Sequence, residues 1–365
     1  MTDTILSFAF SKFATGDELD RFEPITAGHI NRTYAVFVKG DEKPKYVMQK
    51  INTSIFKDPV GLIANIKGVC AHIRKKIEAR GGDVMREVLA LIPTVDGEDF
   101  LNCEDGCFRL YYFIQNATAH QAANRPKLLY YAAEAFGNYQ NLLSDYPAET
   151  LSETIPNFHH TVSRFADFTK AINDNVAGRL DECTDEVKTA QDLEPYAHII
   201  VDALAAGEIP LRVTHNDTKL NNIMLDDETD QGVCVIDLDT VMPGSLLYDF
   251  GDSIRFAACN SKEDETDLSK VYLCLDLFEE YTAGFLSGVG KNITAKEIEL
   301  LPVSALIMTY EVAIRFLGDY LNGDVYFQTH REKHNLERAR TQLTLALDIQ
   351  KKLPEMAEIV KKYTK

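Results

Sequence analysis

Apolar residues along the first third of the chain follow two different periods. Between residues 20 and 55 they alternate with polar residues, as in the segment TYAVFV, which predicts strands. Between residues 57 and 80 they recur every three or four positions, which predicts one helix ended by the glycine pair that follows. Strand-like segments with two Asp-Gly turns return from residue 88 to 115. This part of the chain therefore predicts an antiparallel sheet with one long helix.

Helical spacing dominates the rest of the chain. Helices are predicted near residues 129–143, 160–178 and 184–206, and further helices run to the C-terminus after a short strand-rich segment at 211–237. The sequence therefore predicts an α+β fold of two lobes: a β-rich lobe at 1–115 and a larger, mostly helical lobe at 116–365. A length of 365 residues with 45% hydrophobic content suits two lobes, and we expect a ligand cleft where they meet.

The segment RVTHNDTKLNNIML, which begins at Arg212, is unusually rich in polar residues for a turn between two strands. The strand that follows it, the turn DDETDQG and the returning strand VCVID predict a hairpin. Closing this hairpin brings Asn222 near Asp237, with Asp217 on the loop just upstream. The spacing H-x-D-x-x-x-x-N, followed by an Asp after a hairpin, is the catalytic-loop pattern of the protein-kinase architecture.

Each oxygen-bearing side chain of this segment has an expected task. Asn222 and Asp237 suit Mg²⁺, which prefers carboxylate and amide oxygens and keeps substrate phosphate in its coordination shell. Asp217 is placed to accept a proton from a hydroxyl, as a general base. A turn that merely caps two strands is the ordinary explanation for a lone Asp-Asn pair, but it does not account for His215, Asp217, Asn222 and Asp237 together.

Three neighbouring residues are open to other interpretations. Asp249 belongs to a literal Asp-Phe-Gly, yet it lies too far beyond the hairpin to hold the same metal, so we expect a structural role in bonding the catalytic-loop backbone or capping the next helix. His215 is expected to pack and bond to loop backbone. Asp239 could reach the water shell of the metal or simply anchor its loop.

The charge balance and the cysteines restrict the class of protein. A formal net charge of −18 without any basic run argues against nucleic acid and anionic membranes as partners. We find no basic segment typical of a signal peptide and no apolar stretch that approaches membrane-spanning length. Seven cysteines at irregular spacing favour a reducing, cytoplasmic location. For Cys103 and Cys107, at the ends of a predicted hairpin, two unlinked thiols are a simpler explanation than a disulfide or a metal site.

Several blocks of the sequence resemble the aminoglycoside phosphotransferase/choline kinase family. They are AGHINRTY, YVMQKIN, VTHNDTKLNNIMLD, CVIDLDTVMPGSLLYDFGDSIR and RFLGDYLNGDVYF, which span most of the chain. Within that family the later blocks look like those of the N-acetylhexosamine 1-kinases, which transfer phosphate from ATP to the anomeric hydroxyl of N-acetylglucosamine or N-acetylgalactosamine. The resemblance implies a protein-kinase-like fold, with ATP and Mg²⁺ as cofactors.

The resemblance also implies a nucleotide site on the N-terminal lobe. TAGHIN is similar to the loop that covers the phosphates of the nucleotide, although it has one glycine where the family pattern has three. Lys50 stands where the strand lysine of the fold meets the phosphates, although no acidic partner for it is evident. The segment YYFIQN resembles the hinge that offers backbone groups to adenine. The residues implied are Gly28, His29, Ile30, Asn31, Lys50, Phe113 and Gln115.

The acceptor site is implied by the block that ends in GDVYF. Arg315 and Tyr326 match sugar-contacting positions of the family, and Asp319 and Asp324 lie beside them in the sequence. Polar side chains can bind sugar hydroxyls, and an aromatic ring can cover the apolar face of a sugar. By residue type alone, Arg315 and Asp319 would instead form a surface ion pair, so the sugar site depends on the resemblance.

Three other functions remain open at this point. A kinase of the same fold could act on choline, ethanolamine, an aminoglycoside or another sugar, but cationic substrates would favour an acidic or aromatic cage rather than an arginine. A nucleotide-binding pseudokinase is opposed by the complete set of Asp217, Asn222 and Asp237. A metal-dependent hydrolase would need more metal ligands than the sequence groups together.

Overall fold

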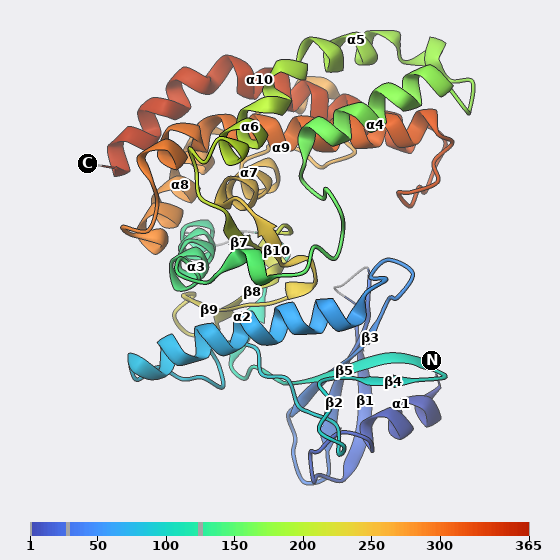
Figure 1. Cartoon of the computed structure of the whole chain (residues 1–365), viewed down its shortest axis with the longest axis vertical. Helices are drawn as coiled ribbons and strands as arrows, with labels where there is room; N and C mark the ends of the chain where they lie inside the picture. Colours follow the sequence, from blue (N-terminus) through green and yellow to red (C-terminus); the bar gives the residue numbers. More distant parts are fainter. Residues whose placement is uncertain (1, 27–29, 123–126, 365) are drawn as a thin grey trace.

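The computed structural model describes residues 2–26, 30–122 and 127–364, which form a smaller and a larger lobe (Figure 1). The N-terminal lobe is a five-stranded antiparallel sheet in the order β1-β2-β3-β5-β4, with helix α1 on its outer face. Apolar side chains of α1 pack there against alternate residues of the strands. The elements are α1 (Asp3–Phe10), β1 (Leu19–Ile25), β2 (Arg32–Val38), β3 (Tyr46–Ile51), β4 (Leu101–Cys103) and β5 (Gly106–Tyr112).

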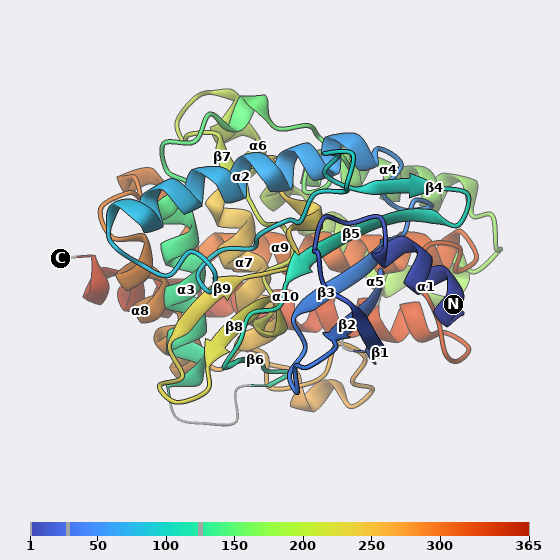
Figure 2. The same cartoon turned by 90° about the horizontal axis from the view of Figure 1, so that it is seen from below.

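Helix α2 (Pro59–Ala79) lies across the junction of the two lobes, as both views of the ribbon show (Figures 1 and 2). Asp58 caps its first turn by accepting the Gly61 N–H at 2.9 Å. Its buried apolar stripe packs on residues of both lobes. The buried Asn65 donates to the carbonyl oxygens of Ser152 and Val241 at 2.8 and 2.9 Å, which ties the helix to the larger lobe.

The C-terminal lobe is mostly helical, and two long helices form its centre. α9 (Ala295–Leu321) packs against α10 (His334–Tyr363) and α7 (Leu246–Ala257), while α3 (Leu128–Leu142) packs against α8 (Leu275–Val289). The glycine of the Asp-Phe-Gly sequence, Gly251, allows α7 to approach α9, because a Cβ there would lie 2.4 Å from the Ser304 carbonyl oxygen. The remaining helices are α4 (Thr161–Asp174), α5 (Thr184–Asp192) and α6 (His198–Ala205).

Helix α9 corrects one expectation. By length and composition it is apolar enough to cross a membrane, although the sequence was expected to contain no such stretch. However, 89% of its most apolar 18-residue window is buried inside the protein. Its hydropathy therefore reflects its place as the core helix of the larger lobe.

Two small sheets within residues 117–244 carry the catalytic segment. β6 (Ala117–Ala119), β8 (Ile223–Asp226) and β9 (Gly232–Val235) form one antiparallel sheet, and β7 (Arg212–Thr214) pairs with β10 (Met242–Gly244) in the other. The buried Arg212 is held by two contacts of 2.6 and 2.7 Å to the buried Glu297 on α9. The start of the catalytic segment is thereby fixed to the core of the lobe.

The predicted α+β, two-lobed arrangement is confirmed, and the long helix ends at the glycine pair as expected, with Gly81 at φ 73°. Two local predictions were wrong, and one helix was missed. Residues 88–92 form only an isolated bridge between Leu91 and Tyr111 rather than a strand. The helix expected over 184–206 is broken into α5 and α6, and α1 was not predicted. The hairpin at Cys103 and Cys107 forms, and both thiols are free.

Candidate active site

The backbone of the loop at His215 and Asn216 is held by one buried carboxylate, that of Asp249. Asp249, in the first turn of α7, accepts the backbone N–H groups of His215 and Asn216 at 3.0 and 2.8 Å, and the Gln140 side chain at 2.7 Å. Burial raises the pKa of Asp249, although these three hydrogen bonds and His215 oppose the shift. Asn216 takes a left-handed conformation, with φ 65°. Asp249 therefore has the structural role expected for it.

His215 bonds to backbone, as expected, and does not act as a free base. Its Nε2 lies 2.9 Å from the Ile236 carbonyl oxygen, and its Nδ1 lies 3.2 Å from the Asp217 backbone nitrogen. The second contact requires an unprotonated Nδ1, so the ring donates from Nε2 to Ile236. This fully buried imidazole joins the loop that precedes Asp217 to the strand end that precedes Asp237.

Asp217, Asn222 and Lys219 form the centre of the loop. Asn222 donates its amide N–H groups to the backbone oxygen of Asp217 at 2.8 Å and to its carboxylate at 3.2 Å. This leaves the amide oxygen of Asn222 as the end available to another ligand. The Lys219 ammonium lies 2.7 Å from the other carboxylate oxygen of Asp217. Asp217 and Lys219 both line the cleft.

The hairpin brings Asp237 to the same place, as predicted. The Ile236 N–H donates to the Asn222 carbonyl oxygen at 2.9 Å, which sets the two strand ends side by side. Asp237 also takes a left-handed backbone conformation, with φ 58°. Although its side chain opens onto the cleft, the surrounding protein together with Asp239 and Asp217 raises its pKa to about 6. The loop thus concentrates negative charge where Asp237 meets the cleft.

These groups fit a magnesium ion. Carboxylate and amide oxygens are the protein ligands that Mg²⁺ prefers, and a cation here would relieve the repulsion among the carboxylates. Within the described ranges no group of three or more His, Cys, Asp and Glu side chains is placed to hold a metal. Asn222 and Asp237 would thus supply a partial ligand set, which a substrate phosphate and water would complete.

Asp239 faces the N-terminal lobe and is held from there. The Arg109 guanidinium on β5 lies 2.5 Å from one of its oxygens, and Asn31 donates to the other at 2.6 Å. Arg109 also donates from Nε to Gln49 on β3 at 2.9 Å. Both members of the ion pair are buried, with side-chain exposures of 1% and 4%. Asp239 is therefore an anchor between the lobes, which decides between the two roles considered for it.

Lys50 is not in the cleft, which contradicts the role expected from the resemblance. Successive side chains of a strand point to opposite faces of a sheet, and Lys50 shares the face of Tyr46 and Met48, which pack beneath α1. Its ammonium lies 5.7 Å from the centre of the Phe108 ring on that outer face. The cleft-facing neighbour of Lys50 on β3 is Gln49.

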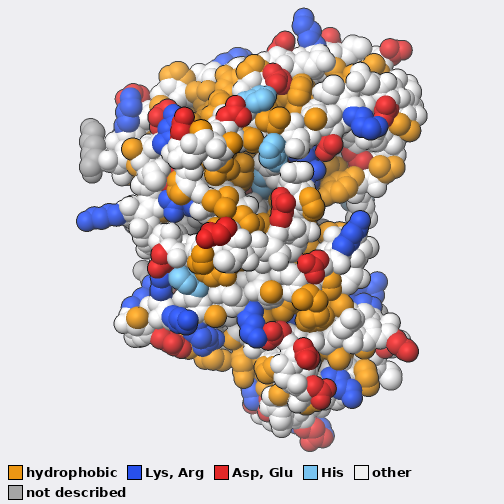
Figure 3. Space-filling view, in the orientation of Figure 1, with side chains coloured by type: hydrophobic (Ala, Val, Ile, Leu, Met, Phe, Trp, Pro, Cys, Tyr) orange, Lys and Arg blue, Asp and Glu red, His pale blue; other side chains and the backbone are white. Residues whose placement is uncertain are grey.

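Of the other residues expected to bind the nucleotide, some line the cavity between the lobes and others do not. A cavity of about 920 Å³ lies between the lobes, and Ile30, Asn31 and Phe113 line it. Gln115 does not, because its side chain donates to the Pro44 carbonyl oxygen at 2.6 Å and its own carbonyl accepts Arg86 at 3.1 Å. Gly28 and His29 lie outside the described residues. The space-filling view shows a waist between the lobes, with acidic and basic side chains mixed over the visible face (Figure 3).

Arg315 does not line the cavity between the lobes. Its guanidinium carbon is 5.5, 5.9 and 5.6 Å from the ring centres of Phe158, Tyr326 and Phe327. The nearest carboxylate, that of Glu311, is 4.0 Å away and is already bound by His159 at 2.7 Å and Thr161 at 2.8 Å. Arg315 is thus flanked by rings, and its one ion pair within the described residues is the 4.0 Å contact with Glu311.

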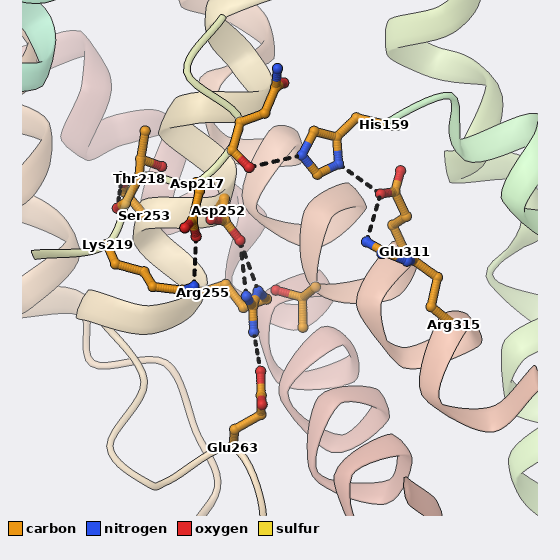
Figure 4. Close-up of polar contacts among 12 residues, drawn as sticks. His159, Asp217, Thr218, Lys219, Asp252, Ser253, Arg255, Glu263, Glu311 and Arg315 are labelled. Carbon is orange, nitrogen blue, oxygen red and sulfur yellow. Dashed lines mark hydrogen bonds and ion pairs between the residues drawn. The ribbon is translucent and has the colours of Figure 1, made fainter. Parts of the chain in front are cut away.

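His159 connects this region to the catalytic loop. It lies between the loop and α9, with one ring nitrogen at Glu311 and the other 3.4 Å from the Asn216 carbonyl oxygen (Figure 4). Although burial opposes ionisation, His159 keeps the pKa of Glu311 below its usual value. On the loop's other flank, Arg255 binds Asp252 at 2.9 Å and Glu263 at 2.8 Å.

Asp319 and Asp324 are not free for a ligand, which corrects the expectation for both. Asp319 accepts the backbone N–H groups of Val325, Tyr326 and Phe327 at 2.8–3.0 Å, and the Asn335 side chain at 2.9 Å. Asp324 pairs with Arg179 at 2.5 Å and also accepts from Asn335. Both carboxylates instead hold the loop that carries Tyr326, which is 67% exposed beside Arg315.

Comparison with known proteins identifies the family. The sequence model of the "Phosphotransferase enzyme family" matches residues 21–272, which is more than half of the chain. The chain belongs to this phosphotransferase enzyme family.

Solved structures of similar fold cover nearly the whole chain. A microcompartment-associated aminopropanol kinase matches with a TM-score of 0.59 and 15% identity over 98% of this chain and 99% of its own. A choline kinase from Cryptosporidium parvum matches with a TM-score of 0.59 and 14% identity over 97% of each chain. Spectinomycin phosphotransferase in complex with ADP and spectinomycin matches with a TM-score of 0.55 and 13% identity over 97% of this chain and 99% of its own. At these identities the likeness concerns the fold.

Two residues of this phosphotransferase's site were missed by the sequence analysis. Lys219 lies two positions after Asp217, and its charge directly beside the candidate base could have drawn attention. Arg109 stands alone in the otherwise apolar segment CFRLYYF. A charged residue in a strand of that kind is rarely buried without a partner, so it signals a specific contact.

Proposed function

We propose that this phosphotransferase transfers phosphate from ATP to the anomeric hydroxyl of an N-acetylhexosamine, N-acetylglucosamine or N-acetylgalactosamine, with Mg²⁺ held at Asn222 and Asp237. Its family and the cleft between the lobes support a kinase acting on a small molecule. The seven free cysteines support a cytoplasmic location. The net charge of −18 supports neither nucleic acid nor an anionic membrane as a partner.

Proton and charge handling follow from the catalytic loop. Asp217 accepts the proton of the acceptor hydroxyl as its oxygen bonds to the transferred phosphorus, and the bond from that phosphorus to the ADP oxygen breaks. Asn222 helps to orient Asp217 through one hydrogen bond to its carboxylate and one to its backbone oxygen. Lys219, 2.7 Å from Asp217, offers a positive charge to the phosphoryl group in transfer. When bound, Mg²⁺ would neutralise phosphate charge.

The observation that carries the substrate class is the charge around Arg315. Its only carboxylate within 4.0 Å in the described part of the chain is Glu311, which already binds His159 and Thr161. A second arginine, Arg164, lies nearby. Burial and the positive charge of Arg315 both lower the pKa of Arg164. Such a site disfavours choline, ethanolamine and aminoglycosides, which are cations, and suits a neutral acceptor with hydroxyl and acetamide oxygens.

Tyr326 completes the argument for a sugar. Its exposed ring lies beside the guanidinium of Arg315, so an acceptor could place its apolar face on the ring and its oxygens on the arginine. The alternative is a kinase for another small alcohol, in line with the aminopropanol, choline and spectinomycin enzymes of the same fold.

An ADP-release screen tests the proposal. Purified protein with Mg-ATP is offered hexoses, N-acetylhexosamines, choline, ethanolamine, aminopropanol and aminoglycosides at equal concentration. We expect turnover with N-acetylglucosamine or N-acetylgalactosamine, and at most weak turnover with the cations. Turnover of a cationic acceptor and of no hexosamine would contradict the assignment of the substrate. Binding of ATP without turnover of any acceptor would favour a pseudokinase.

A further inference from the structure

Among the described residues of the N-terminal lobe, Arg109 is the buried cation that lines the cavity between the lobes, and it lies on an unexpected strand. β3 and β5 pair so that Gln49 lies opposite Arg109, and Lys50 lies opposite Phe108. Paired residues of neighbouring strands share a face of the sheet. Gln49 and Arg109 line the cavity, whereas Lys50 and Phe108 lie on the face covered by α1. The lysine cannot reach the cavity without turning the strand over.

The guanidinium of Arg109 has one donor nitrogen to spare. Nε donates to Gln49 at 2.9 Å, and one terminal nitrogen, Nη2, lies 2.5 Å from Asp239. The other, Nη1, is buried and meets no acceptor within the described ranges. An unpaired N–H of a charged group is costly in a site from which water is excluded, so an acceptor from a ligand would stabilise it.

The neighbours of Arg109 hold its position before a ligand arrives. Asp239 is itself held by Asn31 at 2.6 Å, and Asn31 also accepts the Asn52 backbone N–H at 2.9 Å. The Tyr111 ring centre lies 5.3 Å from the guanidinium carbon. These contacts fix the plane of the guanidinium, which suits the binding of phosphate oxygens by a rigid donor group.

We infer that Arg109, paired with Asp239, is the strand cation that binds the phosphates of the nucleotide, in place of Lys50. In this arrangement the free Nη1 donates to a phosphate oxygen, and the counter-ion of the arginine comes from the loop after the metal residue Asp237. Asn65 of α2 donates its amide to the Val241 carbonyl oxygen at the end of that loop, so this contact supplies no acid. The inference rests on the proposed use of ATP.

The test compares nucleotides with and without phosphates. Affinities for ADP and adenosine are measured by calorimetry for the wild type, Lys50→Met, Arg109→Lys and the double variant Arg109→Met/Asp239→Asn. The double variant removes the ion pair as a whole, because Arg109→Met alone would leave a buried carboxylate unpaired. Circular dichroism and thermal melting establish that each variant is folded.

We expect the double variant to lose about 10- to 100-fold in ADP affinity and to keep its adenosine affinity within about twofold. Arg109→Lys should recover only part of the loss, since an ammonium cannot serve Gln49, Asp239 and a phosphate together. Lys50→Met should change neither affinity by more than about twofold, because its side chain lies on the outer face.

Three results would overturn the inference. An ADP loss in Lys50→Met without one in the double variant would return the role to the lysine. Equal losses of ADP and adenosine in the double variant would show that Arg109 only supports the wall of the cavity. A wild type that binds no adenine nucleotide would overturn the proposed function, and with it the inference, whereas the first two results leave that function standing.

Discussion

The two walls of the cleft hold their polar side chains in different ways. On the larger lobe, Asp217, Asn222 and His215 are fixed by groups of the same lobe, and all depend on the backbone contacts of Asp249. On the smaller lobe, Arg109 and Asn31 both end on a carboxylate that belongs to the opposite wall. The groups proposed for proton transfer are therefore assembled within one lobe, whereas those proposed for the nucleotide depend on how the lobes meet.

The two walls also differ in the charges that they bring to the cleft. Asp217 and Asp237 contribute negative charge from the larger lobe, and burial together with the neighbouring carboxylates raises the pKa of Asp237. Arg109 crosses the cleft to neutralise Asp239, the third carboxylate. Lys219 pairs with Asp217, and a bound magnesium ion would neutralise Asp237.

The largest effect is expected from the larger lobe alone. Asp217→Asn removes the proton acceptor and should lower kcat by roughly 10²–10⁴-fold while ADP binding persists, because the amide keeps the shape of the side chain. Steady-state kinetics and calorimetry measure the two quantities. Glu228→Gln, on the exposed turn of the hairpin, is the matched acid-to-amide control. Near wild-type turnover of Asp217→Asn would remove this residue from the mechanism.

The next variant separates the two aspartates that follow the loop. Asp237→Ala should reduce nucleotide affinity in Mg²⁺ to the value measured in EDTA, because the carboxylate ligand is lost. Asp249→Ala should keep the Mg²⁺ dependence and lower the free energy of unfolding by about 2–4 kcal/mol, since three buried donors lose their acceptor. A folded Asp249→Ala that no longer responds to Mg²⁺ would reverse the assignment.

A third variant acts at the acceptor end of the larger lobe. Arg315→Ala should lower kcat/KM for the hexosamine about 5- to 150-fold, because polar groups of the substrate lose a charged donor. The affinity for ADP should change little, since Arg315 lies outside the nucleotide cavity. Arg340→Ala, another α-helical arginine, whose partner is Glu186 on α5, serves as control. Parallel losses of ADP and sugar affinity would instead indicate a general disturbance of the fold.

The smallest effect is expected for Asn31, whose side chain supports the contact between the walls. Asn31→Ala removes one hydrogen bond to Asp239 and should raise the KM for ATP about 2- to 10-fold, with kcat nearly unchanged. Initial rates at saturating hexosamine measure both constants. A loss in kcat of the size seen for Asp217→Asn would mean that proton transfer also depends on the meeting of the lobes.

How much of the site the sequence could predict depends on how local each contact is. The roles of His215 and Asp249 and the approach of Asn222 to Asp237 follow from a loop and a hairpin within a few dozen residues, and the structure places all four as predicted. Asp319 accepts N–H groups that lie only six to eight positions after it, but a carboxylate near an arginine in the sequence suggested a ligand contact instead.

The failures concern strand faces and pairing. Lys50 and Gln49 are adjacent, and which of them faces the cleft depends on the register with β5 and on α1, which was not predicted. The partner of Arg109 lies 130 positions away in the sequence, on the other lobe. The alternation of apolar and polar residues in a strand shows that neighbouring side chains point to opposite faces of the sheet. It does not show which of the two faces lines the cleft.

Phosphorus NMR of the reaction product tests the central proposal most directly. The protein is incubated with Mg-ATP and N-acetylglucosamine or N-acetylgalactosamine, and the new phosphorus resonance is examined for coupling to the anomeric proton. The account predicts a glycosyl 1-phosphate, with that coupling present and with a phosphate that is labile in acid and stable in base. A 6-phosphate, or a phosphorylated amino alcohol as the only product obtainable, would contradict it.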